Sequence, residues 1–539
     1  MTSPNTTFDP VTLEVAWTRL ISIVDEAAVA LVRTSFSTVV RESWDFSCVI
    51  TDSTGQSLAQ ATDSIPAFIG TLPKTVGHFL AAYPPETLRP GDVLITNDPW
   101  QGTGHLPDIT VARPIFLEGR LIGFSASTAH SPDIGGKIRS PEAREIYEEG
   151  LQIPIMKVID DGQVNETLFR FLRRNVRTPE LTVGDLWAQI SALELMQKRV
   201  GELMADYGLD SLDGLAAEIQ GRCERAMRAG IAALPDGVYR ASLLTDGLEQ
   251  PLTIAMTMTV AGETVAADFS GTSPQVPHAI NLPLCYTFAM VAYGLKCVVA
   301  PTLPNNGGSI RPITVSAPEG CLVNPHYPAS VASRALTGHF IPNLVFHALG
   351  EVVPERVMGM VGSPLWSITQ SGVDDHGKPY ANLFFLNGGM GGNALRDGES
   401  TLSWPSNIAS TPTEVIEQMA GLRVIHRRLR PGSGGEGRHR GGLGQEFLFE
   451  NLSEGETTMF LSAERTRIAA PGFGGGKPGA TGAVLIDGKL VDPKRQHIVT
   501  KGALMELRTP GGGGYGPPEQ RDPAAVAHDR AMGYVEPGE

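Results

Sequence analysis

The stretch "DITVARPIFLEGRLIGFSASTAH", residues 108–130, predicts a β-hairpin. Two runs of apolar and β-branched residues flank Glu118-Gly119-Arg120, which reads as a turn. A three-residue turn places Asp108 opposite His130, and a two-residue loop shifts it opposite Ala129. Directly opposed residues have Cβ atoms about 4.5–5.5 Å apart. The hairpin therefore predicts that Asp108 and His130 are neighbours in space.

The residues before the hairpin, "NDPWQGTGHLPDITV" (97–111), place a histidine three positions ahead of Asp108. Pro107 holds Leu106 extended and can turn His105 back toward the open end of the hairpin, where Asp108 and His130 lie. Two imidazoles and a carboxylate suit one divalent ion, Zn, Mn or Fe, and three protein ligands leave a position open for water or substrate. The alternative is that His105 caps a turn and Asp108 only begins a strand.

Further acidic residues lie close to this motif in the sequence. Asp98 precedes it, and Asp133 follows in "AHSPDIGG" (129–136), where both are expected to orient the imidazoles. Glu149 follows Glu145 by one helical turn in "REIYEEGLQIP" and is a candidate general base. We take Glu149 and Asp133 as candidate catalytic residues, and the alternative for the two glutamates is a solvated helix face.

Composition and charge exclude several classes of function. The chain has 539 residues with a formal net charge of −15, which disfavours a phosphate-backbone partner, so no nucleic-acid partner is expected. Its 5 cysteines show no CxxC spacing, which argues against a disulfide framework or a cysteine zinc site. No signal peptide is visible, and the most apolar run (282–301) contains Pro283 and Lys296. We expect a cytoplasmic protein without a membrane partner.

The periodicity along the chain predicts an α+β, multi-domain fold of mixed sheets and hairpins. Asp9-Pro10 caps a first amphipathic helix that ends near Ser35. Other expected elements are a strand pair over 45–61, a helical segment at about 165–234, strands over 237–271, a helix over 284–300, and a Gly-rich β C-terminal part. The expected domains are an N-terminal metal-site region (1–235), a central α/β region (236–420) and a Gly-rich C-terminal β region (421–539).

The motifs resemble the hydantoinase B / 5-oxoprolinase / acetone-carboxylase-type family, and the chain looks like an N-methylhydantoinase B-like subunit. The resemblance runs in order from about residue 12 to 535. Besides the hairpin motif, it rests on "WDFSCVITDSTGQSLAQA", "NVRTPELTVGDLWAQISA", "ADFSGTSPQVPHAINLPL", "PNNGGSIRPITVSAPEGCLVNP", "RPGSGGEGRHRGGLGQ" and "TPGGGGYGPPEQRDP".

This resemblance implies a metal site and a partner. It places metal ligands at Asp45 in "WDFS", His105 and Asp108 in "GHLPD", and His130 in "AHSPD". Asp45 comes from the resemblance alone. The implied partner is a larger hydantoinase A-type subunit that binds ATP and magnesium, so a hetero-oligomer is expected. Two residues depart from the family pattern. Many relatives have a His or a Trp at the position of Ser131, and many have a His at the position of Phe68, which points to a different substrate.

The leading functional hypothesis is the metal-bearing subunit of an ATP-dependent cyclic amidohydrolase that opens a hydantoin, oxoproline or lactam ring. One alternative is a subunit of an ATP-dependent ketone carboxylase. Another is a non-catalytic scaffold for the ATP-using partner. ATP-dependent ring opening, bicarbonate incorporation and metal content separate the three.

Three glycine-rich stretches invite other interpretations. "GFGGGKPGATG" (472–482) resembles a phosphate loop, but Pro478 follows Lys477 where a Ser or Thr is needed. "PGSGGEGRHRGGLG" (431–444) could touch a phosphate through Arg438 or Arg440, although a loop between strands is favoured. "TPGGGGYG" (509–516) allows close backbone approach, either to a partner or within an ordinary turn.

Overall fold

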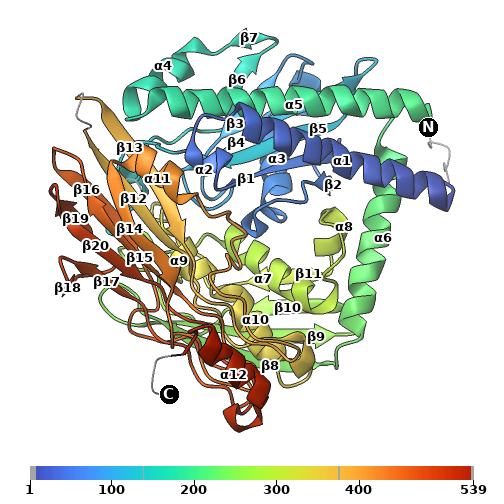
Figure 1. The fold of residues 1–539 in the computed structure, drawn as a ribbon. Coiled ribbons are helices and arrows are strands. Elements are labelled where there is room, and N and C mark those ends of the chain that lie inside the picture. Colours follow the sequence, from blue (N-terminus) through green and yellow to red (C-terminus); the bar gives the residue numbers. More distant parts are fainter. Residues whose placement is uncertain (1–7, 138, 374–376, 536–539) are drawn as a thin grey trace.

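The computed structural model describes residues 8–137, 139–373 and 377–535. Within these residues the strands form four sheets and the helices join or cover them, so the expected α+β class is confirmed (Figure 1). The helices are α1 Pro10–Thr34, α2 Thr38–Arg41, α3 Thr71–Ala82, α4 Glu166–Asn175, α5 Pro179–Tyr207, α6 Asp213–Ala232, α7 Leu284–Val299, α8 Gly307–Ile310, α9 Ala335–Gly338, α10 Ile341–Leu349, α11 Thr413–Ala420 and α12 Pro523–Ala531.

Short 3-10 turns supplement these helices. They are η1 Pro66–Phe68, η2 Pro85–Thr87, η3 Ile146–Glu148, η4 Pro354–Arg356 and η5 Pro518–Gln520. The third of them corrects one expectation, because Glu145 and Glu149 flank a single 3-10 turn and do not share a helix face.

The N-terminal sheet is antiparallel and has seven strands in the order β2-β1-β5-β4-β3-β6-β7. Its strands are β1 Phe46–Asp52, β2 Ser57–Gln60, β3 Val93–Thr96, β4 Asp108–Leu117, β5 Arg120–His130, β6 Met156–Asp160 and β7 Gln163–Val164. The predicted hairpin is β4–β5. The register shifts at a bulge after Ile115, so each predicted register occurs in one part of the hairpin. A two-residue loop closes the turn, and Asp108 pairs with His130 at the other end.

Helices bury both faces of this sheet. Alternate residues of a strand point to opposite faces, so Cys48 and Ile50 pack in the main core below α1 and α5, whereas Val49 packs with α3. Helix α1 begins as predicted, with the Asp9 side chain accepting hydrogen bonds from the first turn and Pro10 at its first position. Figure 1 shows α1 and α5 lying side by side across the sheet.

Helix α6 leads from this region to a second sheet of order β11-β10-β9-β8 (Figure 1). Its strands are β8 Gly237–Thr245, β9 Leu252–Ala261, β10 Thr264–Asp268 and β11 Ile313–Ser316. Helix α10 packs on α7 and on β8, so the predicted helix over 284–300 is buried as expected. The segment 330–340 leads into α10 and reaches the open end of the β4–β5 hairpin, where Arg334 donates to Asp108.

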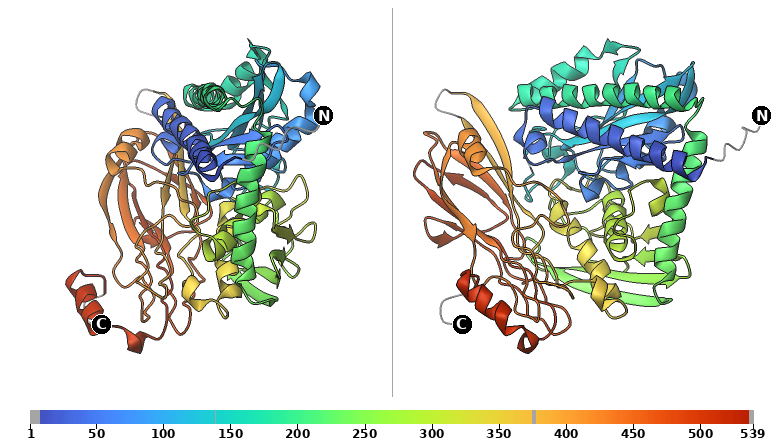
Figure 2. Two further views of the ribbon diagram at one scale, coloured as in Figure 1. Left: turned by 90° about the vertical axis from the view of Figure 1, so that its right-hand side faces the viewer. Right: turned by 45° about the vertical axis from the view of Figure 1, so that its right-hand side comes forward.

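The C-terminal strands form two antiparallel sheets that pack face to face. One has the order β13-β12-β16-β19 and the other β14-β15-β20-β17-β18. The strands are β12 Trp366–Val373, β13 Pro379–Leu386, β14 Leu422–Leu429, β15 Gln445–Asn451, β16 Thr457–Ser462, β17 Ala483–Ile486, β18 Lys489–Leu490, β19 Gln496–Val499 and β20 Leu504–Arg508. The alternating burial of β15 places Phe447 and Phe449 in a core of their own between the sheets. Both views of Figure 2 show this sandwich beside the two earlier regions.

Glycine-rich segments pack against one another beside the sandwich. Gly512 donates a backbone hydrogen bond to Gly442, and Gly435 donates one to Gly512. A Cβ atom on Gly512 would lie 1.9 Å from the carbonyl oxygen of Met390, so no larger residue fits. The close approach predicted for 509–516 is therefore made, within the described structure, to other glycine segments of the same chain.

Two other expectations concern organisation. The division into domains at about residues 235 and 420 stays a prediction. Among the described residues, the structure contains no helix that is long and apolar enough to cross a membrane.

Candidate metal centre

Four side chains predicted as ligands come from neighbouring strand ends of the N-terminal sheet. Asp45 immediately precedes β1, His130 ends β5, and Asp108 begins β4. The predicted Asp108–His130 pairing is confirmed. Strand β1 pairs with the other edge of β5, and the backbone N–H of His130 donates to the carbonyl of Asp45. This pairing brings Asp45 to the same place, and the loop before β4 adds His105.

The side chains form a tight group around one carboxylate oxygen. Asp108 Oδ1 lies 2.8 Å from His105 Nε2 and 3.0 Å from His130 Nδ1. One ligand atom from each of these three residues lies within 4.8 Å of the other two. Asp45 Oδ2 lies 3.9 Å from His130 Nδ1, at the edge of the group.

Contacts from distant segments hold the group in this arrangement. The carbonyl oxygen of Ala332 lies 2.9 Å from His105 Nδ1, and Asp108 Oδ2 accepts hydrogen bonds from Thr103 and Arg334. The Arg334 guanidinium also stacks on the Tyr286 ring, 4.3 Å from its centroid. These contacts lock both the imidazole and the carboxylate in orientation.

Burial sets the protonation of the group. It lowers the pKa of His105 to about 3, helped by the positive charge of Arg334, so this imidazole is neutral. Burial raises the pKa of Asp45. Burial alone would also raise the pKa of Asp108, but the Arg334 guanidinium opposes this effect, and that pKa lies well below its ordinary value.

The residues present fit a divalent cation. A carbonyl can only accept, so the neutral His105 ring carries its proton on Nδ1 and presents a lone pair from Nε2. That lone pair faces the Asp108 carboxylate oxygen at 2.8 Å, and within the described part of the chain Nε2 is buried without a hydrogen-bond donor. Two acceptors at this distance repel each other unless a cation contacts both, and among the described contacts Arg334 donates to Asp108 Oδ2 and to neither of these two atoms.

A small cavity of about 30 Å³ opens onto the group, which is room for about one ion or water molecule. Its lining residues are Asp45, Ile65, Ala67, Phe68, His105, Asp108, Arg139, Tyr286, Arg334, Ala335, His339, Leu365, Ser406 and Ile408. Phe68, singled out in the sequence, thus forms part of the cavity wall. Its ring offers an apolar surface where a histidine would offer a nitrogen.

The expected supporting acids have other bonds. Asp133 accepts hydrogen bonds from the Gly135 backbone and from the backbone and guanidinium of Arg177. Asp98 accepts from the backbone of Trp100 and caps a turn. Neither carboxylate makes the expected bond to an imidazole among the described contacts, so the second-layer role predicted for them is wrong. The acceptor at His105 is the Ala332 carbonyl.

Glu149 is buried and bonded to the segment that holds His105. Its Oε1 accepts hydrogen bonds from the Ser330 hydroxyl and from the backbone N–H groups of Val331 and Ala332. Burial raises the pKa of Glu149 to about 7. Glu145 is exposed. Glu149 is therefore connected to His105 through Ala332, although it does not line the cavity itself.

Sequence reasoning missed the charged residues that the middle of the chain contributes. Arg334 and His339 lie near α9, and Arg139 lies in the loop after β5. No spacing rule joins these positions to the hairpin. The signal that could have found them is the cluster "ASRALTGH" (332–339), which places an arginine and a histidine among small apolar residues.

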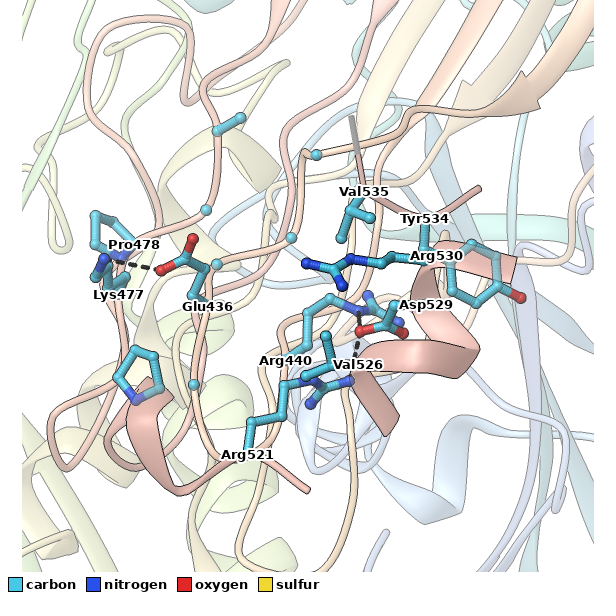
Figure 3. A pocket seen from close by; sticks show the side chains of 17 residues that line it. Glu436, Arg440, Lys477, Pro478, Arg521, Val526, Asp529, Arg530, Tyr534 and Val535 are labelled. Atoms are coloured by element: carbon cyan, nitrogen blue, oxygen red, sulfur yellow. Dashed lines mark hydrogen bonds and ion pairs between the residues drawn. The ribbon is translucent and has the colours of Figure 1, made fainter. Parts of the chain in front are cut away.

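Two of the glycine-rich stretches, 431–444 and 472–482, line a different and larger cavity of about 510 Å³, together with residues of α12. Figure 3 shows ion pairs among several of its charged residues. Lys477 pairs with Glu436, while Arg440 and Arg521 both contact Asp529. This cavity shares no lining residue with the metal-centre cavity.

The chain is similar to several known proteins along most of its length. Residues 9–518 match the family model described as hydantoinase B/oxoprolinase. A Pseudomonas protein (strain NS671), provisionally named as the B component of a D-/L-hydantoinase, is 33% identical over 98% of this chain and 93% of its own length. The beta component of the caprolactamase of Pseudomonas jessenii is 30% identical over 98% of this chain and 94% of its own.

Solved structures share the fold. The ATP-dependent caprolactamase of Pseudomonas jessenii superposes with a TM-score of 0.90 at 28% identity, over 98% of this chain and 95% of that one. Nucleotide-free acetone carboxylase superposes with a TM-score of 0.88 at 21% identity, over 98% of this chain and 78% of that one, which shows a common fold. The chain therefore belongs to the hydantoinase B/oxoprolinase family.

Proposed function

We propose that this chain is the metal-bearing subunit of an ATP-dependent cyclic amidohydrolase that opens a hydantoin, oxoproline or lactam ring. It acts in the cytoplasm with a hydantoinase A-type subunit that binds ATP and magnesium. Family membership supports this proposal, because relatives are named as hydantoinase, 5-oxoprolinase and caprolactamase, two of them as one subunit of the enzyme.

The observation that carries the metal-bearing role is the approach of two acceptors, His105 Nε2 and Asp108 Oδ1, at 2.8 Å in a buried cavity. One divalent ion, Zn, Mn or Fe, held by Asp45, His105, Asp108 and His130 relieves this repulsion. When bound, such an ion polarises a carbonyl oxygen and lowers the pKa of a water molecule to about 7.

The surrounding residues of the chain keep the ligands in place. Arg334 neutralises Asp108 and fixes its Oδ2, so that Oδ1 stays turned toward the imidazoles. Glu149 holds the segment 330–332 and thereby the carbonyl that orients His105. We assign Glu149 as a positioning residue, and Asp133 as a residue that ties the loop after β5 to Arg177.

ATP is needed because an unstrained amide resists hydrolysis. In the proposed reaction the partner subunit transfers the γ-phosphoryl group of ATP to the amide oxygen, which makes the ring carbon open to attack by water. The ring C–N bond then breaks, and the nitrogen leaves as an amine from a lactam or as a urea nitrogen from hydantoin. The acyl phosphate that remains is hydrolysed by a second water molecule. Overall, one ATP and two water molecules are consumed, and ADP, inorganic phosphate and the ring-opened acid are released.

The test uses the purified pair of subunits with hydantoin, 5-oxoproline or a lactam, with and without ATP. Ring-opened product that forms only when ATP and both subunits are present supports the proposal. Incorporation of labelled bicarbonate into a ketone, without ring opening, would identify a carboxylase instead. A metal-free chain beside a partner that is active alone would identify a scaffold.

A further inference from the structure

The metal-centre cavity contains two buried arginines with different surroundings. Arg334 is fully engaged, because its guanidinium donates to Asp108 Oδ2 and to the Thr103 carbonyl and stacks on Tyr286. Arg139 is 6% exposed, and its Nε is buried without an acceptor among the described residues. Its guanidinium carbon lies 5.4 Å from the centroid of the Phe385 ring.

The backbone of Arg139 is held in a costly conformation. Its φ of +45° lies in the left-handed region, which a residue with a long side chain rarely adopts. The Arg139 carbonyl oxygen accepts hydrogen bonds from the hydroxyls of Ser333 and Ser462, at 2.8 and 3.3 Å, which fix this conformation. Backbone strain of this kind persists where the surrounding structure imposes it, and it gathers at binding sites. Here it directs a guanidinium into the cavity.

His339 lines the same cavity, and one of its ring nitrogens also has no hydrogen-bond partner among the described residues. It is 3% exposed, and its Nδ1 is buried without a hydrogen bond in the described structure. Burial lowers the pKa of His339 to about 3, and the positive charges of Arg334 and Arg139 add to this effect. The ring is therefore neutral and can present one N–H group to a ligand.

The charges around the cavity favour an anion once the metal is bound. The carboxylates of Asp45 and Asp108 balance the guanidinium groups of Arg139 and Arg334, and the two histidines that line the cavity, His105 and His339, are neutral. A divalent ion then leaves the cavity with two excess positive charges. A negatively charged oxygen is the complementary ligand.

We propose that Arg139 and His339 form an oxyanion subsite that receives one negatively charged oxygen of the activated substrate beside the metal ligands. The inference rests on the proposed function and extends it. The oxygen belongs to a phosphoryl group if the reaction opens a cyclic amide, and to a carbonate-type group if it carboxylates a ketone. Arg334 serves Asp108, whereas Arg139 serves the ligand.

The test measures anion binding by the full-length chain loaded with metal. Inorganic phosphate and bicarbonate are titrated separately into the wild type and into Arg139→Gln, with calorimetry as the readout and element analysis on every sample. Loss of a charge-assisted hydrogen bond predicts at least about tenfold weaker binding of the preferred anion by Arg139→Gln, with unchanged metal content. Arg495→Gln, which removes an arginine that is 40% exposed and pairs with Glu142, is the matched control.

Two further variants keep the test decisive if Arg139→Gln fails to fold. Arg139→Lys keeps the charge and is expected to retain measurable anion binding. His339→Phe keeps the planar ring and is expected to weaken anion binding without loss of metal. Preference for phosphate or for bicarbonate identifies which anion the subsite takes.

Equal anion affinities of the wild type and Arg139→Gln would overturn the proposal, and so would a wild type that binds neither anion. These outcomes are distinct from a failure of the proposed function. A wild-type chain that takes up no metal contradicts the metal-bearing role, whereas a metal-loaded wild type that binds neither anion contradicts the subsite alone.

Discussion

Asp108 and His130 lie directly opposite each other on β4 and β5, and Asp108 Oδ1 lies 3.0 Å from His130 Nδ1. A strand pairing thus fixes two of the proposed ligands with respect to each other. His105 is held differently, by the Ala332 carbonyl from the middle of the chain. The metal centre therefore depends on contact between the N-terminal sheet and the segment 330–339.

Glu149→Gln is expected to change how stability depends on pH. Burial raises the pKa of Glu149 from 4.5 to about 7. Its contribution to stability is therefore complete below the unfolded-state pKa and is lost as the pH rises through about 7. One pKa unit corresponds to about 1.4 kcal/mol, so this loss is of the order of 3 kcal/mol.

Denaturant unfolding at about pH 5 and about pH 8 checks this expectation, because the glutamine keeps the acceptor oxygen but does not titrate. The fall in the unfolding midpoint between the two pH values should be smaller for Glu149→Gln than for the wild type. Glu145 lies on the same segment but is exposed, so Glu145→Gln should show the same fall in unfolding midpoint as the wild type. A Glu149→Gln variant with the same pH dependence as the wild type would rule out a titrating Glu149.

The local part of the fold follows from the sequence. The first helix and its cap, the hairpin over 108–130, the helical segment at about 165–234 and the helix over 284–300 all form where the periodicity places them. Each depends on neighbours in the chain, through side-chain spacing, capping or turn chemistry. The glutamates at 145 and 149 show the limit, since a one-turn spacing does not by itself specify a helix.

Asp246→Ala is expected to loosen the connection between β8 and the C-terminal sandwich. Asp246 is 1% exposed, and its carboxylate accepts hydrogen bonds from the backbone of Thr466, Arg467 and Ile468. Removing it leaves these part-buried backbone donors without their acceptor, at a cost of about 1–3 kcal/mol. Thermal unfolding monitored by circular dichroism should show a clearly lower midpoint than for Asp210→Ala, an exposed aspartate. Equal unfolding midpoints for the two variants would show that the hydrogen bonds of Asp246 do not stabilise this connection.

Gly512→Ala is expected to disrupt the packing of the glycine-rich segments. The added methyl group would meet the Met390 carbonyl oxygen at 1.9 Å, and the backbone cannot move without breaking its hydrogen bonds. Overpacking of this severity predicts a loss of about 3 kcal/mol or more, or no soluble protein. Gly455→Ala is the control, because the nearest atom to its added methyl group is 3.8 Å away. Equal unfolding midpoints for the two variants would contradict the close packing at Gly512.

The site could be predicted only where its geometry is local. The hairpin register brings Asp108 and His130 together, but Asp45 reaches them through the pairing of β1 with β5. That pairing joins segments about 80 residues apart, and no turn sequence specifies it. Arg139 and Arg334 depend on how the central region packs on the sheet, which sequence periodicity does not contain.

The most direct test compares metal content and ring-opening rate in the same preparations of the reconstituted pair. His105→Ala removes one proposed ligand, and His326→Ala removes an exposed histidine as the control. Loss of residues that only support a metal ligand costs up to about a hundredfold, so loss of the ligand itself should cost at least as much. We expect His105→Ala to lose both its metal and ATP-dependent ring opening and His326→Ala to keep both. A metal-free His105→Ala pair that opens the ring at the wild-type rate would show that ring opening does not need the metal.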